Sequence, residues 1–287
     1  PRLVSPVEVV GEVSPEAMKE TGLPQGTPVI TGSGDVMMDA LEKEVEKHGL
    51  KGKVEIKKVG CVGFCEQGPI IIIYPEEICY LKVKPEDVPE IVSKTLVDGK
   101  IVERLVYTDP NTGEKIPKLG EIPFYKHQHR LLLANNGRID PRSIEDYIAV
   151  GGYKALAKAL FEMKPEEIIE EIKASNLRGR GGAGFPTGIK WETTRNAPGE
   201  PKYVIVNCDE GDPGAFMDRA LVEGNPHSVL EGLIIGAYAI GAHEGFVYVR
   251  EEYPMAAENI SLAIKQAEEY GLLGENIMGS NFSFKVT

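Results

Sequence analysis

The sequence predicts an α/β protein built from two units. Stretches with the period of strands alternate with amphipathic helical stretches along most of the 287 residues. This length suffices for two domains with hydrophobic cores of their own. We expect four parts, which are an N-terminal extension over residues 1–27, a small unit over 28–100, a connector over 101–135 and a larger unit over 136–287.

The small unit is predicted to contain four strands and two helices. The strands are expected at residues 28–31, 53–59, 70–74 and 78–83, and the helices at 35–48 and 85–97. Pro85 suits the first turn of the second helix, and the pair Asp98-Gly99 suits its end. The order strand, helix, three strands, helix indicates an α/β unit of thioredoxin-like size.

The larger unit is predicted to alternate helices with strands, which favours an α/β layer. Helices are expected at residues 143–150, 153–163, 165–175, within 219–242 and at 254–270, and strands at 202–206, 246–249 and 282–286. The strand KYVIV at 202–206 is expected to be buried. The chain lacks an initiator Met and stops inside a predicted strand, so we expect it to be part of a longer polypeptide.

Composition excludes several classes of function. The net charge is −12 and no basic run appears, so nucleic acid is not an expected partner. The longest apolar runs are too short or too rich in glycine to span a bilayer, and no signal peptide is visible. Four cysteines are too few for a disulfide scaffold. We expect a cytoplasmic protein without direct membrane insertion.

A glycine-rich stretch at residues 176–191, NLRGRGGAGFPTGIKW, is the first candidate site. Glycines are needed where a backbone takes positive φ or lies against a ligand. Successive N–H groups of such a loop, and the helix N-terminus after it, can face phosphate oxygens. Arg178, Arg180 and Lys190 add positive charge, and Phe185 offers a flat face to a planar ring. We name residues 179–188 the glycine loop.

The glycine loop is not predicted to be a Rossmann site. A Rossmann motif follows a strand and opens a helix, whereas the residues before this loop have helical periodicity. Ile168, Ile169 and Ile172 recur there with glutamates between them. The sequence therefore predicts a loop between two helices.

An acidic loop follows the first predicted strand of the larger unit. Asn207, Asp209, Glu210 and Asp212 come at the carboxyl end of that strand, which is where open α/β sheets bind ligands. Carboxylates can accept hydrogen bonds from ribityl, ribose or carboxamide groups. The alternative is a solvated turn. Cys208 is expected to be a small packing residue, because its acidic neighbours raise a thiol pKa.

The two motifs together resemble a known family. GRGGAGFPTGIKW followed by YVIVNCDEGDPGAFMDR is similar to the NADH-oxidising, FMN-binding 51-kDa subunit of respiratory complex I. It is still more similar to the NADH-binding subunits of NAD-linked and electron-bifurcating hydrogenases and formate dehydrogenases. Those subunits carry a thioredoxin-like ferredoxin domain at the N-terminus. The resemblance covers about residues 28–287. It implies a thioredoxin-like, ferredoxin-type α/β fold for the small unit and the FMN-binding α/β fold of the complex I 51-kDa subunit for the larger unit.

The resemblance implies that the glycine loop holds FMN and the NADH that stacks on it. Arg180 and Lys190 would favour the negative charge of the flavin, and Phe185 would stack on the adenine side of NADH. The cofactor-binding residues implied for this stretch are Gly179, Arg180, Gly181, Gly182, Ala183, Gly184, Phe185, Gly188 and Lys190.

The resemblance also assigns roles to the acidic loop. Asn207, Asp209 and Glu210 would contact FMN, with Glu210 positioning the nicotinamide end of NADH. Asp212 falls where the complex I subunit has a glutamate that helps to bind NADH, and it is one methylene shorter. Thr193 falls where some relatives have an aromatic residue for adenine. No side chain is expected to act as acid, base or nucleophile.

The N-terminal ferredoxin domain of the family binds a [2Fe-2S] cluster through C-x4-C and C-x3-C pairs. Cys61 and Cys65 match the second pair and are the candidate metal ligands, whereas the first pair falls on Ile30 and Asp35. Ile30 cannot ligate iron, and a carboxylate is a poor ligand for a cluster that prefers thiolates. We expect the cluster to be absent and the domain to serve for docking. The alternatives are ligands from outside this pair, a redox disulfide, or two buried thiols.

The implied function is that of an NAD(P)H-oxidising flavoprotein subunit, a diaphorase. It would transfer hydride between NAD(H) or NADP(H) and FMN, and electrons to iron–sulfur subunits of a hydrogenase, formate dehydrogenase or complex I-like assembly. A [4Fe-4S] cluster is expected only beyond residue 287. One alternative is a non-catalytic paralogue that acts as an assembly or docking module. Another is a protein that binds dinucleotides without flavin.

Overall fold

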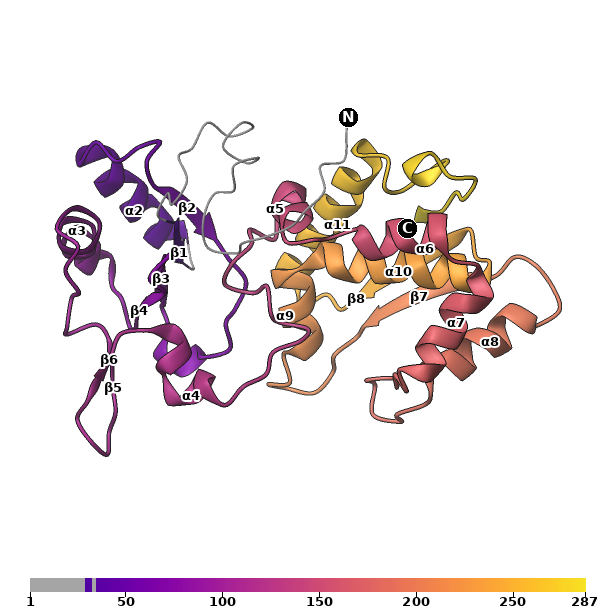
Figure 1. Ribbon diagram of the computed structural model, residues 1–287, viewed down its shortest axis with the longest axis horizontal. Coiled ribbons are helices and arrows are strands. Elements are labelled where there is room, and N and C mark those ends of the chain that lie inside the picture. The colour runs from indigo at the N-terminus through magenta and orange to yellow at the C-terminus, as the bar shows by residue number, and fades with distance from the viewer. Residues whose placement is uncertain (1–28, 33–34) are drawn as a thin grey trace. The chain divides into compact units, whose positions relative to one another are not determined.

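The computed structural model describes residues 29–32 and 35–287. The chain divides into two compact units, Pro1–Asp140 and Pro141–Thr287 (Figure 1). The extension expected over residues 1–27 lies outside the described residues. The four-part division of the chain stays a prediction.

The first unit is built on a four-stranded mixed sheet. Its strands and first helix are β1 (Val29–Gly32), α2 (Asp35–Lys47), β2 (Glu55–Lys58), β3 (Ile71–Tyr74) and β4 (Ile78–Tyr80). The strand order is β2-β1-β3-β4, where β1 is parallel to β2 and antiparallel to β3, and β3 is antiparallel to β4. A single reversed strand in a four-stranded sheet is the thioredoxin-like arrangement, so this prediction is confirmed.

Strand β3 has no polar face because both of its faces are buried. Ile71 and Ile73 join a core with α2 and α3, whereas Ile72 and Tyr74 join a second core on the opposite face. The second core includes Tyr125 of α4 (Pro123–Lys126). Burial of each such side chain stabilises the fold by roughly 1.5–3 kcal/mol.

The predicted helix at residues 85–97 is present in three segments of different winding. A 3-10 turn at Pro85–Asp87 leads into α3 (Val88–Ile91), and a π-helical segment follows at Val92–Val97. Two short strands in the connector, β5 (Tyr107–Thr108) and β6 (Lys115–Ile116), pair in antiparallel fashion.

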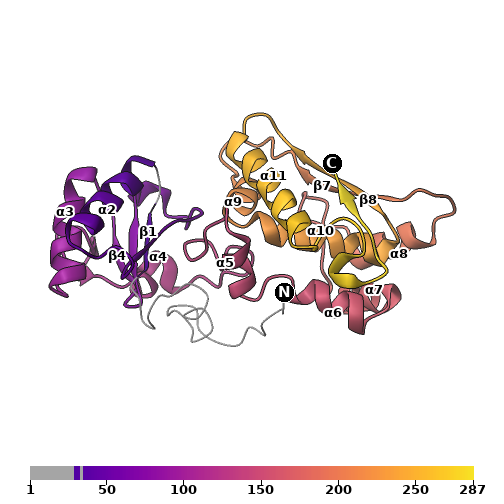
Figure 2. The same ribbon diagram turned by 90° about the horizontal axis from the view of Figure 1, so that it is seen from above.

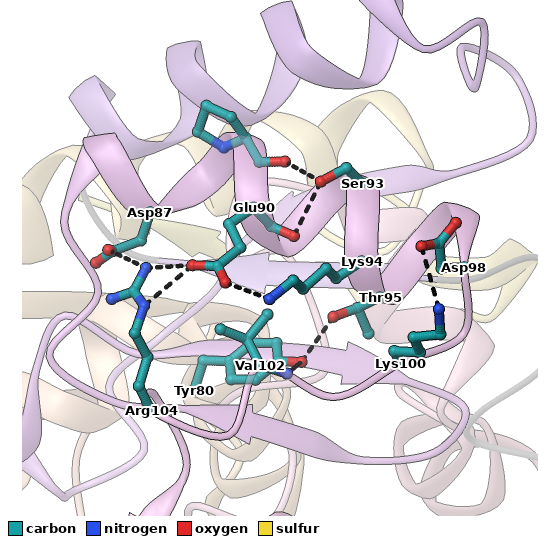
Figure 3. A network of polar contacts seen from close by, with 11 residues as sticks. Tyr80, Asp87, Glu90, Ser93, Lys94, Thr95, Asp98, Lys100, Val102 and Arg104 are labelled. Atoms are coloured by element: carbon teal, nitrogen blue, oxygen red, sulfur yellow. Dashed lines mark hydrogen bonds and ion pairs between the residues drawn. The ribbon is translucent and has the colours of Figure 1, made fainter.

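Polar contacts fasten the chain that follows this helical segment (Figure 3). The Arg104 guanidinium lies 2.7 Å from an Asp87 carboxylate oxygen and donates to Glu90 over 3.0 Å. The Tyr80 hydroxyl lies 2.7 Å from the Thr95 hydroxyl and accepts a hydrogen bond from the Val102 amide over 3.1 Å. Residues 102–104 are therefore tied both to the helical segment and to β4.

Within its described residues, the second unit contains seven α-helices and three parallel strands (Figures 1 and 2). They are α5 (Ile144–Ala149), α6 (Lys154–Glu162), α7 (Pro165–Ala174), α8 (Thr187–Asn196), β7 (Tyr203–Cys208), α9 (Met217–Gly224), α10 (Pro226–Ile240), β8 (Glu244–Val249), α11 (Pro254–Glu269) and β9 (Lys285–Val286). The strand order is β7-β8-β9, and both pairs are parallel. The predicted α/β layer is confirmed.

One expectation for the second unit is confirmed and another needs correction. The stretch 219–242 contains the expected long helix, α10, and also the last part of α9, because Asn225 ends α9 and its side chain accepts the Ser228 amide at the start of α10. The strand expected to be buried at residues 202–206 is half open, with Tyr203 47% and Ile205 63% exposed. Helix α10 packs against β7, and the side chains at alternate positions of the strand point away from its buried side.

A buried polar network joins the first helices of this unit to α10. The Glu231 carboxylate accepts hydrogen bonds from the Tyr147 hydroxyl, 2.6 Å, and from the amides of Tyr153 and Leu156, 2.9 and 3.0 Å. The Tyr153 hydroxyl bonds to His227 Nδ1 over 2.8 Å, and burial lowers the pKa of His227. The donors satisfy a carboxylate that would otherwise be costly to bury.

In the part of the chain that the structure describes, no helix is long and apolar enough to cross a membrane.

Candidate functional site: two loops of the second unit

The glycine loop lies between helices α7 and α8, as predicted. The Gly179 amide donates to the Phe185 carbonyl and the Thr187 amide to the Leu177 carbonyl, each over 2.9 Å. The Arg178 guanidinium donates to the Gly184 carbonyl over 3.1 Å. The loop is thus a narrow hairpin closed by its own backbone, and Arg178 serves that closure.

The tip of the glycine loop is open. A Cβ atom built on Gly181, Gly182 or Gly184 would meet no atom within 4 Å. Gly182 and Gly184 have φ values of +97° and +62°, which L side chains rarely adopt. Phe185 is 55% exposed beside them. The backbone of the tip is therefore accessible to a ligand, and two of its positions require glycine.

Gly188 has a different environment from the tip. It is buried in the first turn of α8, and a Cβ atom there would lie 2.5 Å from Lys173 Cγ and 2.8 Å from the Lys173 backbone nitrogen. Its missing side chain lets α8 pack closely on α7. The predicted contact of Gly188 with a cofactor stays a prediction, and the structure supplies a packing reason for this glycine.

Two cations of the loop region have no ion-pair partner among the described residues. Arg180 and Lys190 are exposed. By contrast, Lys173 pairs with Glu170 over 2.8 Å and with Glu192 over 2.6 Å, and Arg195 pairs with Glu166. Helix α8 also begins without a side-chain cap. Arg180, Lys190 and the first amides of α8 therefore form an environment suited to an anion.

The acidic loop joins β7 to α9 and contains both exposed and buried polar side chains. Asp209 and Asp212 are exposed. Asn207 accepts the Asp209 amide over 2.9 Å, which is an Asx turn, so its side chain shapes the loop. In Figure 1 the acidic loop and the glycine loop both lie along the lower border of the second unit.

Glu210 turns its carboxylate inward. The residue is 8% exposed, and its carboxylate accepts the amides of Met217, Asp218 and Arg219 over 2.6, 3.2 and 3.2 Å. These amides open α9, where the helix dipole favours negative charge. The role of Glu210 at the nicotinamide stays a prediction, and its contacts favour a role in fixing the loop.

Two residues that the sequence analysis missed hold Glu210 from the end of strand β8. The Arg250 guanidinium donates to the Glu210 carbonyl and pairs with Glu252 over 2.6 Å. The Tyr253 hydroxyl donates to the same carbonyl over 3.3 Å. The signal for both was available, because they lie in the segment after β8 and the carboxyl ends of parallel strands share one edge of the sheet.

Cationic side chains stack on the Tyr253 ring. The guanidinium carbons of Arg219 and Arg250 lie 5.4 and 5.3 Å from its centre. Arg219 also lies over the exposed ring of Phe216, at 5.2 Å. Such contacts add about 0.5–1 kcal/mol each at exposed sites. They connect the end of β8 with the first turn of α9.

Cys208 is the small packing residue that was predicted. It is 5% exposed. Burial, with the charges of Asp218 and Glu210, raises the pKa of its thiol to about 11. Burial and Glu210 likewise raise the pKa of Asp218. Cys208 is therefore a protonated, unreactive thiol near neutral pH.

The candidate metal ligands of the first unit, Cys61 and Cys65, lie together. Their Sγ atoms are 3.6 Å apart and both residues are exposed, so the alternative of two buried thiols is wrong. Ile30 lies in β1 and Asp35 begins α2, but their side chains are outside the description. Within the described residues, no group of three or more His, Cys, Asp or Glu side chains could hold a metal ion. The absence of a [2Fe-2S] cluster stays a prediction.

Both loops lie in the second unit, and the acidic loop follows the carboxyl end of a parallel strand, which is where open α/β sheets bind ligands. Residues 172–286, which include both loops, match the Nuo51 FMN-binding domain. This part of the chain is therefore similar to that family, which is the family of the complex I 51-kDa subunit. The resemblance drawn from the two motifs is confirmed.

Three relatives show how far the similarity extends. The chain is 56% identical over 161 residues to NADP-reducing hydrogenase subunit HndC of Solidesulfovibrio fructosivorans, a match that covers 56% of this chain and 32% of that protein. It is 52% identical over 156 residues to an NADH-quinone oxidoreductase subunit of Rhizobium meliloti, covering 54% and 37%. It is 32% identical over 255 residues to NAD-reducing hydrogenase HoxS subunit alpha of Cupriavidus necator, covering 85% and 38%. The chain spans about a third of the length of these relatives.

Proposed function

We propose that the chain is part of a diaphorase, the flavoprotein that exchanges hydride between NAD(H) or NADP(H) and FMN and passes electrons to iron–sulfur subunits. The single observation that carries the proposal is the match of residues 172–286 to an FMN-binding family, with an open glycine loop inside it. The names of the relatives, hydrogenase subunits and quinone oxidoreductase subunits, support the same reaction class.

The residues present fit a flavin phosphate. Gly181, Gly182 and Gly184 leave open space over the loop tip, and backbone amides there can approach phosphate oxygens. Arg180 and Lys190 are exposed and have no ion-pair partner among the described residues. A dianionic phosphate needs this combination of accessible amides and uncommitted cations.

FMN, when bound, supplies the conversion between hydride chemistry and single-electron transfer. The work of this chain is binding and orientation. Arg180 and Lys190 balance phosphate charge, Phe185 presents a flat apolar surface to a ring, and Asp209 and Asp212 accept hydrogen bonds from hydroxyl or amide groups. Glu210 holds the loop that carries those two carboxylates. Orientation of this kind is a large part of catalysis when no side chain acts as acid, base or nucleophile.

We further propose that the partners are iron–sulfur subunits of a hydrogenase, formate dehydrogenase or complex I-like assembly in the cytoplasm. The hydrogenase and quinone oxidoreductase relatives, each named as a subunit, support the assembly. The four cysteines of the chain are too few for a disulfide scaffold, which supports a reducing compartment.

A visible absorption spectrum of the chain purified without oxygen and reloaded with FMN tests the proposal. We expect a flavin band that bleaches within the mixing time after NADH or NADPH is added. Bound flavin that neither nucleotide bleaches would point to the non-catalytic paralogue instead. A chain that binds nucleotide but stays colourless after reloading would match a plain dinucleotide-binding protein.

A further inference from the structure

We propose that Cys61 and Cys65 form a thiol–disulfide exchange site for low-molecular-weight disulfides of the glutathione type, closing to a reversible disulfide within one loop. Their Sγ atoms are 3.6 Å apart, and a disulfide needs about 2 Å. The proposal concerns the first unit and does not depend on the proposed flavin chemistry.

The backbone around the two thiols is held in place. Phe64, between them in the chain, stacks on Phe124 with ring centres 4.4 Å apart and planes 4° from parallel. The Asn136 side-chain amide donates to the Cys61 carbonyl over 3.2 Å. These contacts anchor the Phe64 ring and the Cys61 carbonyl, and we infer that rotation of the two cysteine side chains supplies the remaining approach of the sulfur atoms.

The two sulfur atoms are not equivalent. The Gly63 amide donates to Cys61 Sγ over 3.3 Å, so the loop backbone fixes the position of that sulfur atom. We assign Cys61, whose sulfur atom is positioned by the loop backbone, as the attacking residue and Cys65 as the resolving one.

The reaction balances without a further reagent. The Cys61 thiolate attacks one sulfur of the external disulfide, and the departing thiolate takes up a proton. Cys65, on losing its proton, attacks Cys61 Sγ and releases the second external thiol. One protein disulfide forms, two protein thiols are oxidised by two electrons, and the external disulfide is reduced to two thiols.

The other two cysteines provide an internal contrast. Cys79 is fully buried, and burial raises the pKa of its thiol to about 12; Cys208 is 5% exposed. Neither offers an accessible thiolate, so exchange should be confined to Cys61 and Cys65.

The test is incubation of the purified chain with oxidised glutathione, followed by denaturing alkylation and intact-mass measurement. We expect the number of alkylated thiols to fall from four to two, with a link between Cys61 and Cys65 and reversal by dithiothreitol. Cys65→Ser should stop at a glutathione adduct on Cys61, and Cys208→Ala should still close the disulfide. Circular dichroism of each variant checks that it folds.

Three results would overturn the proposal. One is a wild-type chain that keeps a glutathione adduct on Cys61 while Cys65 remains alkylatable. A second is a chain whose four thiols all stay reduced over a range of glutathione potentials. The third is protection of both thiols by bound iron, seen as visible absorption and equimolar iron in the purified chain.

Discussion

The glycine loop and the acidic loop differ in what holds them. The glycine loop is closed by hydrogen bonds within itself, and its tip is open with the exposed cations Arg180 and Lys190 nearby. The acidic loop is held from outside, by the buried Glu210 carboxylate on α9 and by Arg250 and Tyr253 from the end of β8. The comparison separates residues that shape a loop from residues that remain free for a ligand.

The largest effect on folding is expected from Glu210→Ala. Three amides at the start of α9 would lose a buried carboxylate, which should lower the free energy of unfolding by about 2–3 kcal/mol. Asp209→Ala, one residue earlier and exposed, should change it by no more than about 0.5 kcal/mol. Urea unfolding of both variants measures the difference, and equal destabilisation would mean that Glu210 does not hold the loop.

The two kinds of glycine in the glycine loop should respond differently to alanine. Gly188→Ala places a methyl group 2.5 Å from Lys173 Cγ and 2.8 Å from a backbone nitrogen, so we expect a loss of about 1–3 kcal/mol. Gly181→Ala meets open space and should leave stability nearly unchanged. Thermal unfolding tests this pair. A stable Gly188→Ala variant would show that the close packing of α8 on α7 is not needed.

Substitution of Arg178 and of Arg180 should show two different roles. Arg178 is expected to close the glycine loop, and Arg180 is expected to attract the charge of the ligand. Arg178→Gln loses a hydrogen bond to the Gly184 carbonyl and should cost about 0.5–1 kcal/mol of stability. Arg180→Gln should leave stability unchanged but weaken FMN binding by roughly fivefold at low salt, with less effect at high salt. Unfolding curves and FMN titrations at two salt concentrations measure both. A salt-independent loss would argue against a direct charge contact.

The smallest expected effect concerns pH. Pairing with Arg250 lowers the pKa of Glu252 to about 2 from an ordinary value of 4.5. Because the folded-state pKa is depressed, this contribution to stability is present above pH 4.5 and is lost as the pH falls toward 2. Glu252→Gln should flatten that part of the stability profile slightly. If Glu252→Gln lost stability at acid pH just as the wild type does, the Arg250–Glu252 pair would contribute little to holding the acidic loop.

Much of the fold was predictable because its signals are local. The helices and hairpin of the first unit follow from period, Pro85 and the turn residues. The winding of residues 92–97 was not predictable, since no local residue type marks a π-helical segment. The open face of β7 was also missed, because KYVIV reads as apolar on both faces and only the packing of α10 shows which face is covered.

The sequence predicted that the candidate site consists of two loops. It did not predict which polar side chains hold a loop in place and which are exposed to a ligand. Composition shows that Asn207, Asp209, Glu210 and Asp212 are polar, yet it does not show that Glu210 turns inward. That depends on where α9 begins, seven residues later, and on Arg250, forty residues away in the chain. Long-range contacts of this kind have no signature in the motif itself.

The central claim is that the open tip of the glycine loop receives the flavin phosphate. The most direct measurement is a fluorescence titration of FMN with the wild-type chain and with Gly181→Ala, alongside their unfolding midpoints. We predict that Gly181→Ala binds FMN at least tenfold more weakly, about 1.4 kcal/mol, while its midpoint stays that of the wild type. Equal affinity of the two proteins would contradict the claim and would place the flavin phosphate elsewhere.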